Sequence, residues 1–187
     1  MHTTPIIDYS IILDALTYYK NSGFLYREVP WIISHPAYVA TRPNNRPEFY
    51  TLGGYLVASG EQGYIQELHE GKELTKHICI TPCFREEEVI DAIHYRYFLK
   101  AELIDTHATQ ENLHSMITTA KKFFEKYTKV SVIQTDTHGK AFDIIDETTG
   151  VELGSYGIRT TNEHAFIYGT AVALPRLSVV ITKNNLQ

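Results

Sequence analysis

The sequence predicts a single α+β domain, residues 1–187, in which an antiparallel sheet is flanked by helices. Three observations lead to this prediction. The chain has 187 residues, 43% of them hydrophobic, which is enough to bury one core. Residues 78–104 have the apolar runs of two long strands joined as a hairpin. Other stretches repeat apolar residues at helical spacing between capping residues and glycines.

The first predicted element is a helix that begins at Pro5, with Thr4 as its cap and Asp8 in its first turn. Gly23 ends this helix, and a short strand over 24–29 follows it, closed by Pro30. The apolar positions that recur at helical spacing are Ile7, Ile11, Ala15, Tyr18 and Tyr19.

A polar loop over 41–48 leads into a predicted strand over 49–59, which is broken by Gly53 and Gly54. Ser59 then caps a helix that runs to about Glu70, just before Gly71. Glu61 lies in the first turn of this helix, where the helix macrodipole favours a carboxylate.

The hairpin over 78–104 carries the charged residues of most interest. Its strands cover 78–84, extended by Arg85 and Glu87, and 93–104. Because alternate residues of a strand face the same side, one face would carry Arg85, Glu87, His94 and Phe98. A planar guanidinium matches phosphate oxygens, an aromatic ring can stack on a base, and a carboxylate can accept from an exocyclic amine. The face therefore suits an anionic, aromatic ligand; the alternative is a solvated sheet face with cross-strand ion pairs.

The second half of the chain continues the pattern of helices and strands. Thr109 caps a helix with one buried stripe, and strands follow over 130–134, 141–145, 150–159 and 168–174. A last helix begins near Pro175. The apolar stripe of the first of these helices is Leu113, Met116, Ile117, Ala120, Phe124 and Tyr127.

Composition argues against several classes of protein. The net charge is −5, and no run of basic residues is longer than Lys121 and Lys122, so a dedicated nucleic-acid surface is not expected. No segment has the length of a membrane span, and the N-terminus lacks a signal peptide, so we expect a soluble, cytoplasmic protein. Cys79 and Cys83 stand too far apart on one strand to be bridged and are expected to be buried thiols.

The hairpin residues resemble motif 2 of the class II aminoacyl-tRNA synthetases, closest to the aspartyl and asparaginyl branch. The resemblance rests on Phe84-Arg85-Glu86-Glu87 followed by His94 and, four residues later, by Phe98. It implies that Arg85 binds the ATP α-phosphate, that Glu87 binds the adenine amine, and that Phe98 stacks on adenine. His94 is expected to contact the phosphates.

Residues 150–159 are similar to a strand of the aspartyl enzymes and of ammonia-dependent asparagine synthetase. The resemblance implies that Glu152 meets Mg²⁺ and ATP, and that Arg159 meets the side-chain carboxylate of the substrate. The small Gly154 and Gly157 would let phosphates approach the backbone. Alternatively, the two glycines mark a bulge and Arg159 pairs with a surface acid.

Two further segments resemble motifs of the same family. Residues 168–177 are similar to motif 3, with Ala171 and Ala173 in place of two glycines, and imply that Arg176 binds the γ-phosphate. An alternative for this strand is ordinary close packing. The helix, strand and Pro30 at the N-terminus resemble motif 1, which implies a homodimer, although any strand terminator would fit there.

The segment at Ser59 resembles the part of the family that precedes motif 2. It implies that Glu61 receives the α-ammonium group of the substrate, with Gln62 as the alternative one residue on. Glu102, on the second hairpin strand, is also assigned to substrate binding. Helix capping is the alternative explanation for Ser59 and Glu61.

Together these resemblances imply a class II synthetase-like α+β core without an anticodon-binding domain. The implied function is ATP-dependent and Mg²⁺-dependent activation of an amino acid, with an acidic, aspartate-like one favoured by Arg159. The acyl-adenylate would pass to an amine, ammonia or a carrier. A second hypothesis is a non-catalytic paralogue that binds nucleotide, amino acid or a partner protein. A third, transfer to tRNA, is disfavoured by the negative charge.

Overall fold

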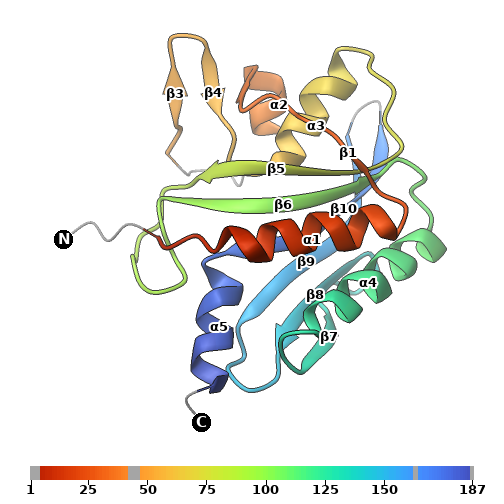
Figure 1. Ribbon diagram of the computed structural model, residues 1–187. Helices are drawn as coiled ribbons and strands as arrows, with labels where there is room; N and C mark the ends of the chain where they lie inside the picture. Colours follow the sequence, from red (N-terminus) through yellow and green to blue (C-terminus); the bar gives the residue numbers. More distant parts are fainter. Residues whose placement is uncertain (1–4, 42–46, 162–163, 186–187) are drawn as a thin grey trace.

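A seven-stranded sheet forms the centre of the protein (Figure 1), for which a computed structural model describes residues 5–41, 47–161 and 164–185. In sheet order the strands are β1 (Leu25–Tyr26), β5 (Lys76–Phe84), β6 (Tyr97–Asp105), β10 (Ala165–Leu174), β9 (Glu152–Thr160), β8 (Ala141–Asp146) and β7 (Val130–Gln134). The α+β prediction is confirmed, with one correction. The edge strand β1 runs parallel to β5, whereas all other neighbours are antiparallel.

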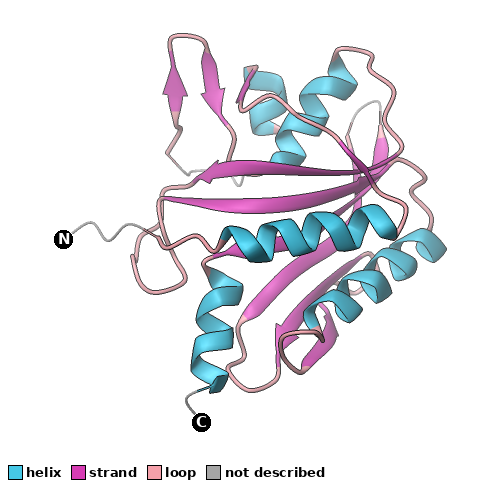
Figure 2. Cartoon of the chain, in the orientation of Figure 1, coloured by secondary structure: helices cyan, strands magenta, loops and turns pink. Residues whose placement is uncertain are grey.

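Helices cover both faces of this sheet (Figure 2). One face packs against α1 (Tyr9–Asn21), α4 (Gln110–Phe124) and α5 (Arg176–Asn185), which together form the larger core. The other face packs against α2 (His35–Val39) and α3 (Gly60–His69), beside a small sheet of β2 (Ile32–Ile33), β4 (Gly54–Leu56) and β3 (Tyr50–Thr51). Neighbouring residues of β5 show the alternation, because Ile78 belongs to the first core and Cys79 to the second.

Helix α4 is the clearest success of the sequence patterns. Thr109 is its N-cap, and the Thr109 hydroxyl accepts a hydrogen bond from the Asn112 N–H at 3.1 Å. The predicted stripe from Leu113 to Phe124 is buried against the sheet, and Tyr127 packs on the same core beyond the end of the helix. An amphipathic stripe of this width leaves only one way to place the helix.

The first helix begins four residues later than predicted. Its N-cap is Asp8, whose carboxylate accepts from the Ser10 N–H at 2.9 Å, so Pro5 and Ile7 precede the helix. Thr4, the predicted cap, lies outside the described residues. An aspartate caps a helix at least as well as a threonine, and the buried positions that anchor α1 start only at Ile11.

The long hairpin is confirmed, but its second strand starts at Tyr97, four residues later than predicted. Residues 85–96 form a loop instead, so the prediction that Arg85 and Glu87 share one face of a strand is wrong. The Arg85 N–H closes the hairpin by donating to the Arg96 carbonyl at 2.8 Å. Within the loop the Asp91 carboxylate accepts from the N–H groups of Ile93 and His94, which favours a turn over an extended strand.

Other predicted elements are confirmed with shorter bounds. The strand over 24–29 is reduced to β1, and the segment over 49–59 folds back at Gly53 and Gly54 as the hairpin of β3 and β4. Gly54 has φ = 141°, and an added Cβ would lie 2.6 Å from the Ile33 carbonyl oxygen. Cys79 and Cys83 are buried free thiols, as expected. Of the described helices, none has the length and apolar character that a bilayer crossing requires.

The sheet divides between β9 and β10. Pairing between these two strands ends at Tyr156 and Gly169, yet β9 continues to pair with β8 as far as Glu152, and β10 with β6 as far as Leu174. Each strand has an irregularity in this region, in β10 between Thr170 and Val172 and opposite β9 between Ile144 and Ile145. The two strands therefore diverge toward the start of α5.

Helix α3 lies so close to its neighbours that a glycine in its interior has no room for a methyl group. A Cβ at Gly63 would lie 2.7 Å from the nearest Val29 methyl and 3.0 Å from the Pro30 carbonyl oxygen. Alanine at a helical glycine normally stabilises by about 1 kcal/mol. At this position we expect the steric conflict with the β-branched Val29 side chain and the Pro30 carbonyl to outweigh that gain.

We therefore predict that Gly63→Ala lowers the free energy of unfolding by about 1–3 kcal/mol, as overpacking does in a dense core. Urea denaturation of the wild type and the variant measures the change. Thr118→Ala, at an exposed position of α4, is the control and should leave stability equal or slightly higher. An increase in stability for Gly63→Ala would contradict the close packing of α3.

Candidate functional site

Strand β6 carries three polar or aromatic side chains on the face that looks toward α3. Phe98, Lys100 and Glu102 are alternate residues of the strand, so they share this face. Two neighbouring cavities lie along it. The first cavity, of about 180 Å³, lies between the 85–96 loop and the diverging ends of β9 and β10. The second cavity, of about 340 Å³, is lined by residues of α2, α3, β6, β9 and β10.

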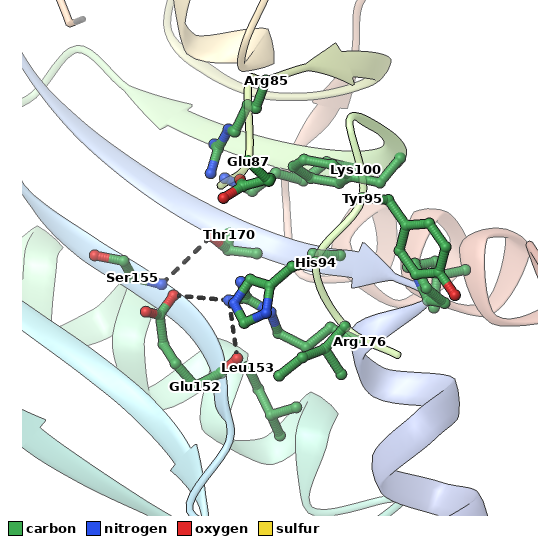
Figure 3. A pocket seen from close by; sticks show the side chains of 15 residues that line it. Arg85, Glu87, His94, Tyr95, Lys100, Glu152, Leu153, Ser155, Thr170 and Arg176 are labelled. Atoms are coloured by element: carbon green, nitrogen blue, oxygen red, sulfur yellow. Dashed lines mark hydrogen bonds and ion pairs between the residues drawn. The ribbon is translucent and has the colours of Figure 1, made fainter. Parts of the chain in front are cut away.

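The structure brings together all the residues expected to bind ATP. They come from the 85–96 loop, β6, β9 and α5, and they line the first cavity (Figure 3): Arg85, Glu87, His94, Phe98, Glu152 and Arg176. The separation of these residues along the chain, from 85 to 176, means that the grouping is a consequence of the fold.

Within the first cavity both arginines are held by protein groups. The Arg85 guanidinium lies over the Phe98 ring, 5.1 Å from its centroid, and its Nε donates to the Ala58 carbonyl at 3.0 Å. Arg176 Nη1 donates to the Glu152 carbonyl at 3.0 Å and to the Glu152 carboxylate at 3.2 Å. The Arg176 contact bridges the start of α5 and the start of β9, across the divergence of the sheet.

A second carboxyl group lies near Glu152. Asp143 pairs with Ser155 in the β8–β9 register. Burial raises the pKa of the Asp143 carboxyl, and the charge of Glu152 raises it further, while the Ser155 hydroxyl and Arg176 lower it. The described residues contain no group of three His, Cys, Asp or Glu side chains arranged to hold a metal ion. Oxygen donors of this kind, two carboxyls and a hydroxyl, suit a hard cation that is shared with a phosphate ligand.

All the residues expected to bind the substrate line the second cavity: Glu61, Gln62, Glu102 and Arg159. Arg159 Nε donates to the Glu61 carboxylate at 2.7 Å, and its guanidinium lies 4.8 Å from the centroid of the Tyr168 ring. Arg159 therefore pairs with a buried acid of the site, and not with a surface acid. Burial raises the pKa of the Glu61 carboxyl, and Arg159 offsets only part of this effect.

Gln62 differs from Glu61 in how its side chain is used. Its amide oxygen accepts from the Ala58 N–H at 2.7 Å, and its amide nitrogen donates to the Tyr38 carbonyl at 2.7 Å. These two bonds join α3 to α2 and to the segment before α3. Of the two residues, Glu61 is the one that brings charge to the cavity.

The Glu102 carboxylate holds the start of α3 against the sheet. It accepts from the Ser59 hydroxyl at 2.6 Å, from the Gly60 N–H, and from the Lys100 ammonium at 2.6 Å. Burial alone would raise the pKa of Glu102, but Lys100 and Ser59 lower it by more, so the pKa lies below its ordinary value. Ser59 is thus both the predicted N-cap of α3 and a partner of Glu102.

Sequence patterns missed three residues that line both cavities together with Arg85: Lys100, Ser155 and Thr170. Lys100 had a detectable signal, because it lies midway between Phe98 and Glu102 on the same strand. No local sequence pattern indicated Ser155 or Thr170. Their positions depend on where β9 and β10 part, which no local pattern reveals.

The glycines of β9 make room for protein side chains rather than for phosphates. A Cβ at Gly154 would lie 2.6 Å from the Tyr156 hydroxyl, and one at Gly157 would lie 2.7 Å from the Tyr168 hydroxyl. The expectation that both glycines let phosphates approach the backbone is therefore corrected. The alternative, a bulge in this region, agrees with the register shift opposite Gly154.

The fold of this chain is similar to that of class II aminoacyl-tRNA synthetases. The structure superimposes on pyrrolysyl-tRNA synthetase from Desulfitobacterium hafniense with a TM-score of 0.72 and 16% identity, covering 94% of this chain and 69% of that one. It also superimposes on seryl-tRNA synthetase from Pyrococcus horikoshii complexed with ATP, with a TM-score of 0.71 and 16% identity. This match covers 93% of this chain and 49% of that one. A third match is cytoplasmic serine-tRNA ligase from Naegleria fowleri in complex with AMP, with a TM-score of 0.68 and 17% identity. It covers 90% of this chain and 51% of that one.

These similarities concern the fold. The chain spans about half the length of the two seryl structures. No protein-family model and no curated protein matches the sequence. The three solved structures named above are pyrrolysyl and seryl enzymes, so the resemblance to the aspartyl and asparaginyl branch stays a prediction.

The bonds of Glu102 predict a pH-dependent contribution to stability. Glu102→Gln keeps the shape but removes the charge that holds Lys100, and we expect a loss of about 2–3 kcal/mol at neutral pH. Because the folded pKa lies below the ordinary value of 4.5, this contribution is complete above that value and disappears as the pH falls through the folded pKa.

Urea denaturation across this pH range should show wild type and variant converging in acid. Glu111→Gln, at an exposed position in the first turn of α4, is the control and should change stability little at any pH. A constant difference between wild type and Glu102→Gln would show that the charge of Glu102 is not the stabilising factor.

Proposed function

We propose that the protein is an ATP-dependent ligase that activates an amino acid as its acyl-adenylate. The observation that supports this most is the division of the site. Residues expected to bind ATP line the first cavity, residues expected to bind the amino acid line the second, and Arg85 lines both. A carboxylate in the second cavity would therefore meet the α-phosphate of a nucleotide in the first at a cationic side chain.

The reaction needs no protein nucleophile. An oxygen of the amino-acid carboxylate attacks the α-phosphorus of ATP and forms a bond to it. The bond between the α-phosphorus and the bridging oxygen of pyrophosphate breaks, and pyrophosphate leaves. In this proposal Arg85 offsets the charge that develops on the phosphate, and Arg176 orients the pyrophosphate as it leaves. Glu87, Phe98 and His94 hold the adenine and the phosphates.

Mg²⁺ fits the oxygen donors at one side of the first cavity. Glu152 and Ser155, which line the cavity, would hold it, and the Asp143 carboxyl that bonds the Ser155 hydroxyl is a further oxygen donor beside them. Bound there, the ion would supply positive charge to the phosphates. Arg176, now paired with Glu152, would be released toward the pyrophosphate.

The second cavity supports an acidic amino acid as the substrate. Glu61 and Arg159 now pair with each other at 2.7 Å. A substrate with an ammonium group and a side-chain carboxylate exchanges this pair for two new ones, so neither buried charge is left alone. The ammonium group of a neutral amino acid would pair with the Glu61 carboxylate, and the Arg159 guanidinium would then be left without an anionic partner.

The acceptor and the assembly belong to the same proposal. We infer that the acyl group passes to an amine, ammonia or a carrier, because the net charge of −5 disfavours tRNA. The cytoplasmic location expected from the sequence is part of this proposal. A homodimer through α1 and β1 is supported by apolar side chains that are exposed there, namely Leu13, Leu25 and Tyr26.

One observation favours a second candidate, a non-catalytic paralogue that binds nucleotide or amino acid. Both Arg176 and Arg159 are paired with carboxylates inside the cavities where substrates would need them. A protein that only senses a ligand tolerates arginines that are paired with its own carboxylates. Such a protein has to bind the ligand but does not need these arginines for catalysis.

The proposal is tested by ATP–pyrophosphate exchange with Mg²⁺ and each standard amino acid in turn. Exchange with one amino acid supports the ligase; none, in a folded protein that binds ATP, supports the paralogue. We predict that Arg85→Ala weakens ATP binding roughly 100-fold while the fold persists, as loss of a charged contact would. Arg96→Ala, on the same loop and paired with Glu86, is the matched control and should bind ATP normally.

Arg159→Ala addresses the choice of amino acid. Removing the guanidinium should lower exchange with the acidic amino acid about tenfold or more, the effect of one charged hydrogen bond, and leave ATP affinity intact. Competition among amino acids in the exchange assay measures the selectivity. If the preference among amino acids does not move, Arg159 does not read the side chain and the acidic substrate is excluded.

A further inference from the structure

Tyr156 lies where the pairing of β9 and β10 stops. Its side chain is fully buried on the face of the larger core, and its hydroxyl donates to the Thr170 carbonyl on β10 at 2.6 Å. The next contact between the strands is also made with a side chain, because the Ser155 N–H donates to the Thr170 hydroxyl at 3.3 Å (Figure 3). Side-chain bonds thus take over where the regular ladder ends.

Two glycines make room for this tyrosine. A Cβ at Gly169, the register partner of Tyr156, would lie 2.7 Å from the Tyr156 ring. A Cβ at Gly154 would lie 2.6 Å from the Tyr156 hydroxyl and 3.1 Å from the Thr170 Cβ. The Tyr156 ring therefore packs against Gly169 of β10, and the Tyr156 hydroxyl lies beside Gly154 of β9. A side chain at either glycine would collide with the tyrosine.

The irregular part of β10 has a second buried tyrosine beside it. The Tyr19 hydroxyl, from α1, donates to the Ala171 carbonyl at 3.3 Å. Ala171 is the residue at which the β6–β10 register shifts. Two successive carbonyls of β10 are thus bonded by tyrosines of the core, which supports the irregular backbone in one conformation.

The first cavity begins immediately beyond these contacts. Its walls include Glu152, Leu153 and Ser155 from β9, and Thr170, Ala173 and Leu174 from β10. We propose that Tyr156 is a positioning residue that holds β9 and β10 apart and so sets the width of the first cavity. The inference concerns the cavity itself and does not depend on the ligase proposal.

The physical reason is the choice of hydrogen-bond donor. With the hydroxyl in place, the side of the Thr170 carbonyl that faces β9 is occupied by a donor from the core. Without it, the nearest replacements are backbone N–H groups of β9, which reach the carbonyl only if the strands close toward a regular ladder. Removing one oxygen atom should therefore narrow the cavity.

A cysteine at position 155 can report this width, because Ser155 lines the cavity and both natural cysteines are fully buried. We would measure the rate at which a small methanethiosulfonate reagent labels Ser155→Cys under native conditions. The same rate is then measured after adding Tyr156→Phe. Tyr18→Phe is the matched control, since it also removes a hydroxyl bonded to a carbonyl, that of Thr119 at 3.0 Å, away from the cavity.

We expect Tyr156→Phe to slow labelling about fivefold, the change in an equilibrium that one ordinary hydrogen bond produces. Tyr18→Phe should leave the rate unchanged or raise it. The direction separates positioning from general stability, because a merely destabilised protein opens and is labelled faster. An unchanged or faster rate for Tyr156→Phe would overturn the proposal.

A second measurement uses the contact with Gly154, and its labelling part applies even if Tyr156→Phe folds poorly. Gly154→Ala pushes the tyrosine hydroxyl from its place, so it should also slow labelling of the cysteine at 155. In urea denaturation, Gly154→Ala should cost less stability when Tyr156→Phe is present, because the clashing oxygen is gone. Equal costs in both backgrounds, with unchanged labelling, would contradict the inference.

A separate ATP titration distinguishes this inference from the proposed function. If the wild type does not bind ATP, the ligase proposal fails while the labelling result still stands. If it binds ATP, Tyr156→Phe should weaken the affinity about fivefold relative to Tyr18→Phe, as a narrowed cavity with one altered hydrogen bond requires.

Discussion

The structure depends above all on one buried carboxylate, that of Glu102. Its oxygens bind the Ser59 hydroxyl and the Gly60 N–H at the start of α3, and the Lys100 ammonium on its own strand. The contact joins a helix N-terminus, where negative charge is favoured, to the middle of the sheet. Because α3 carries Glu61 and lies on this face, the bonds of Glu102 help to hold the residues of the second cavity in place. The same residue thus serves stability and the geometry of the site.

The second constraint is the division of the sheet between β9 and β10. A continuous ladder would fill the space that the first cavity occupies, and the residues at the start of β9 would pair with β10 instead of facing Arg85 and Phe98. Arg176 bridges the opening through its bonds to Glu152. The protein therefore satisfies most charges of its site internally, with Arg159 on Glu61, Arg176 on Glu152 and Lys100 on Glu102. A charged ligand bound in the proposed site would exchange these pairs, and such an exchange would favour ligands whose charges match them.

Local patterns succeeded where a single physical signal dominated. The stripe of α4, the Ser59 cap of α3 and the apolar runs of β5 and β6 each specify an element with little help from the rest of the chain. They failed where two local solutions compete. Asp8 and Thr4 are both competent caps, and only the burial of Ile11 decides between them. Residues 85–96 look like strand continuations, but Asp91 bonds its own loop instead.

The sequence alone singled out the residues proposed for the nucleotide site, because the charged and aromatic side chains stand out against apolar strands. These residues are Arg85, Glu87, Phe98, Glu152 and Arg176. The alternation of Phe98 and Glu102 onto one face follows from the two-residue period of a strand, which is also a local property. Only the tertiary structure decided that these residues form two adjoining cavities, and that Ser155 and Thr170 lie where the cavities meet. The reason is that the divergence of β9 and β10 is set by contacts such as that of Tyr156 with Thr170. Such contacts join residues distant in the chain, and no window of sequence contains both partners and their geometry.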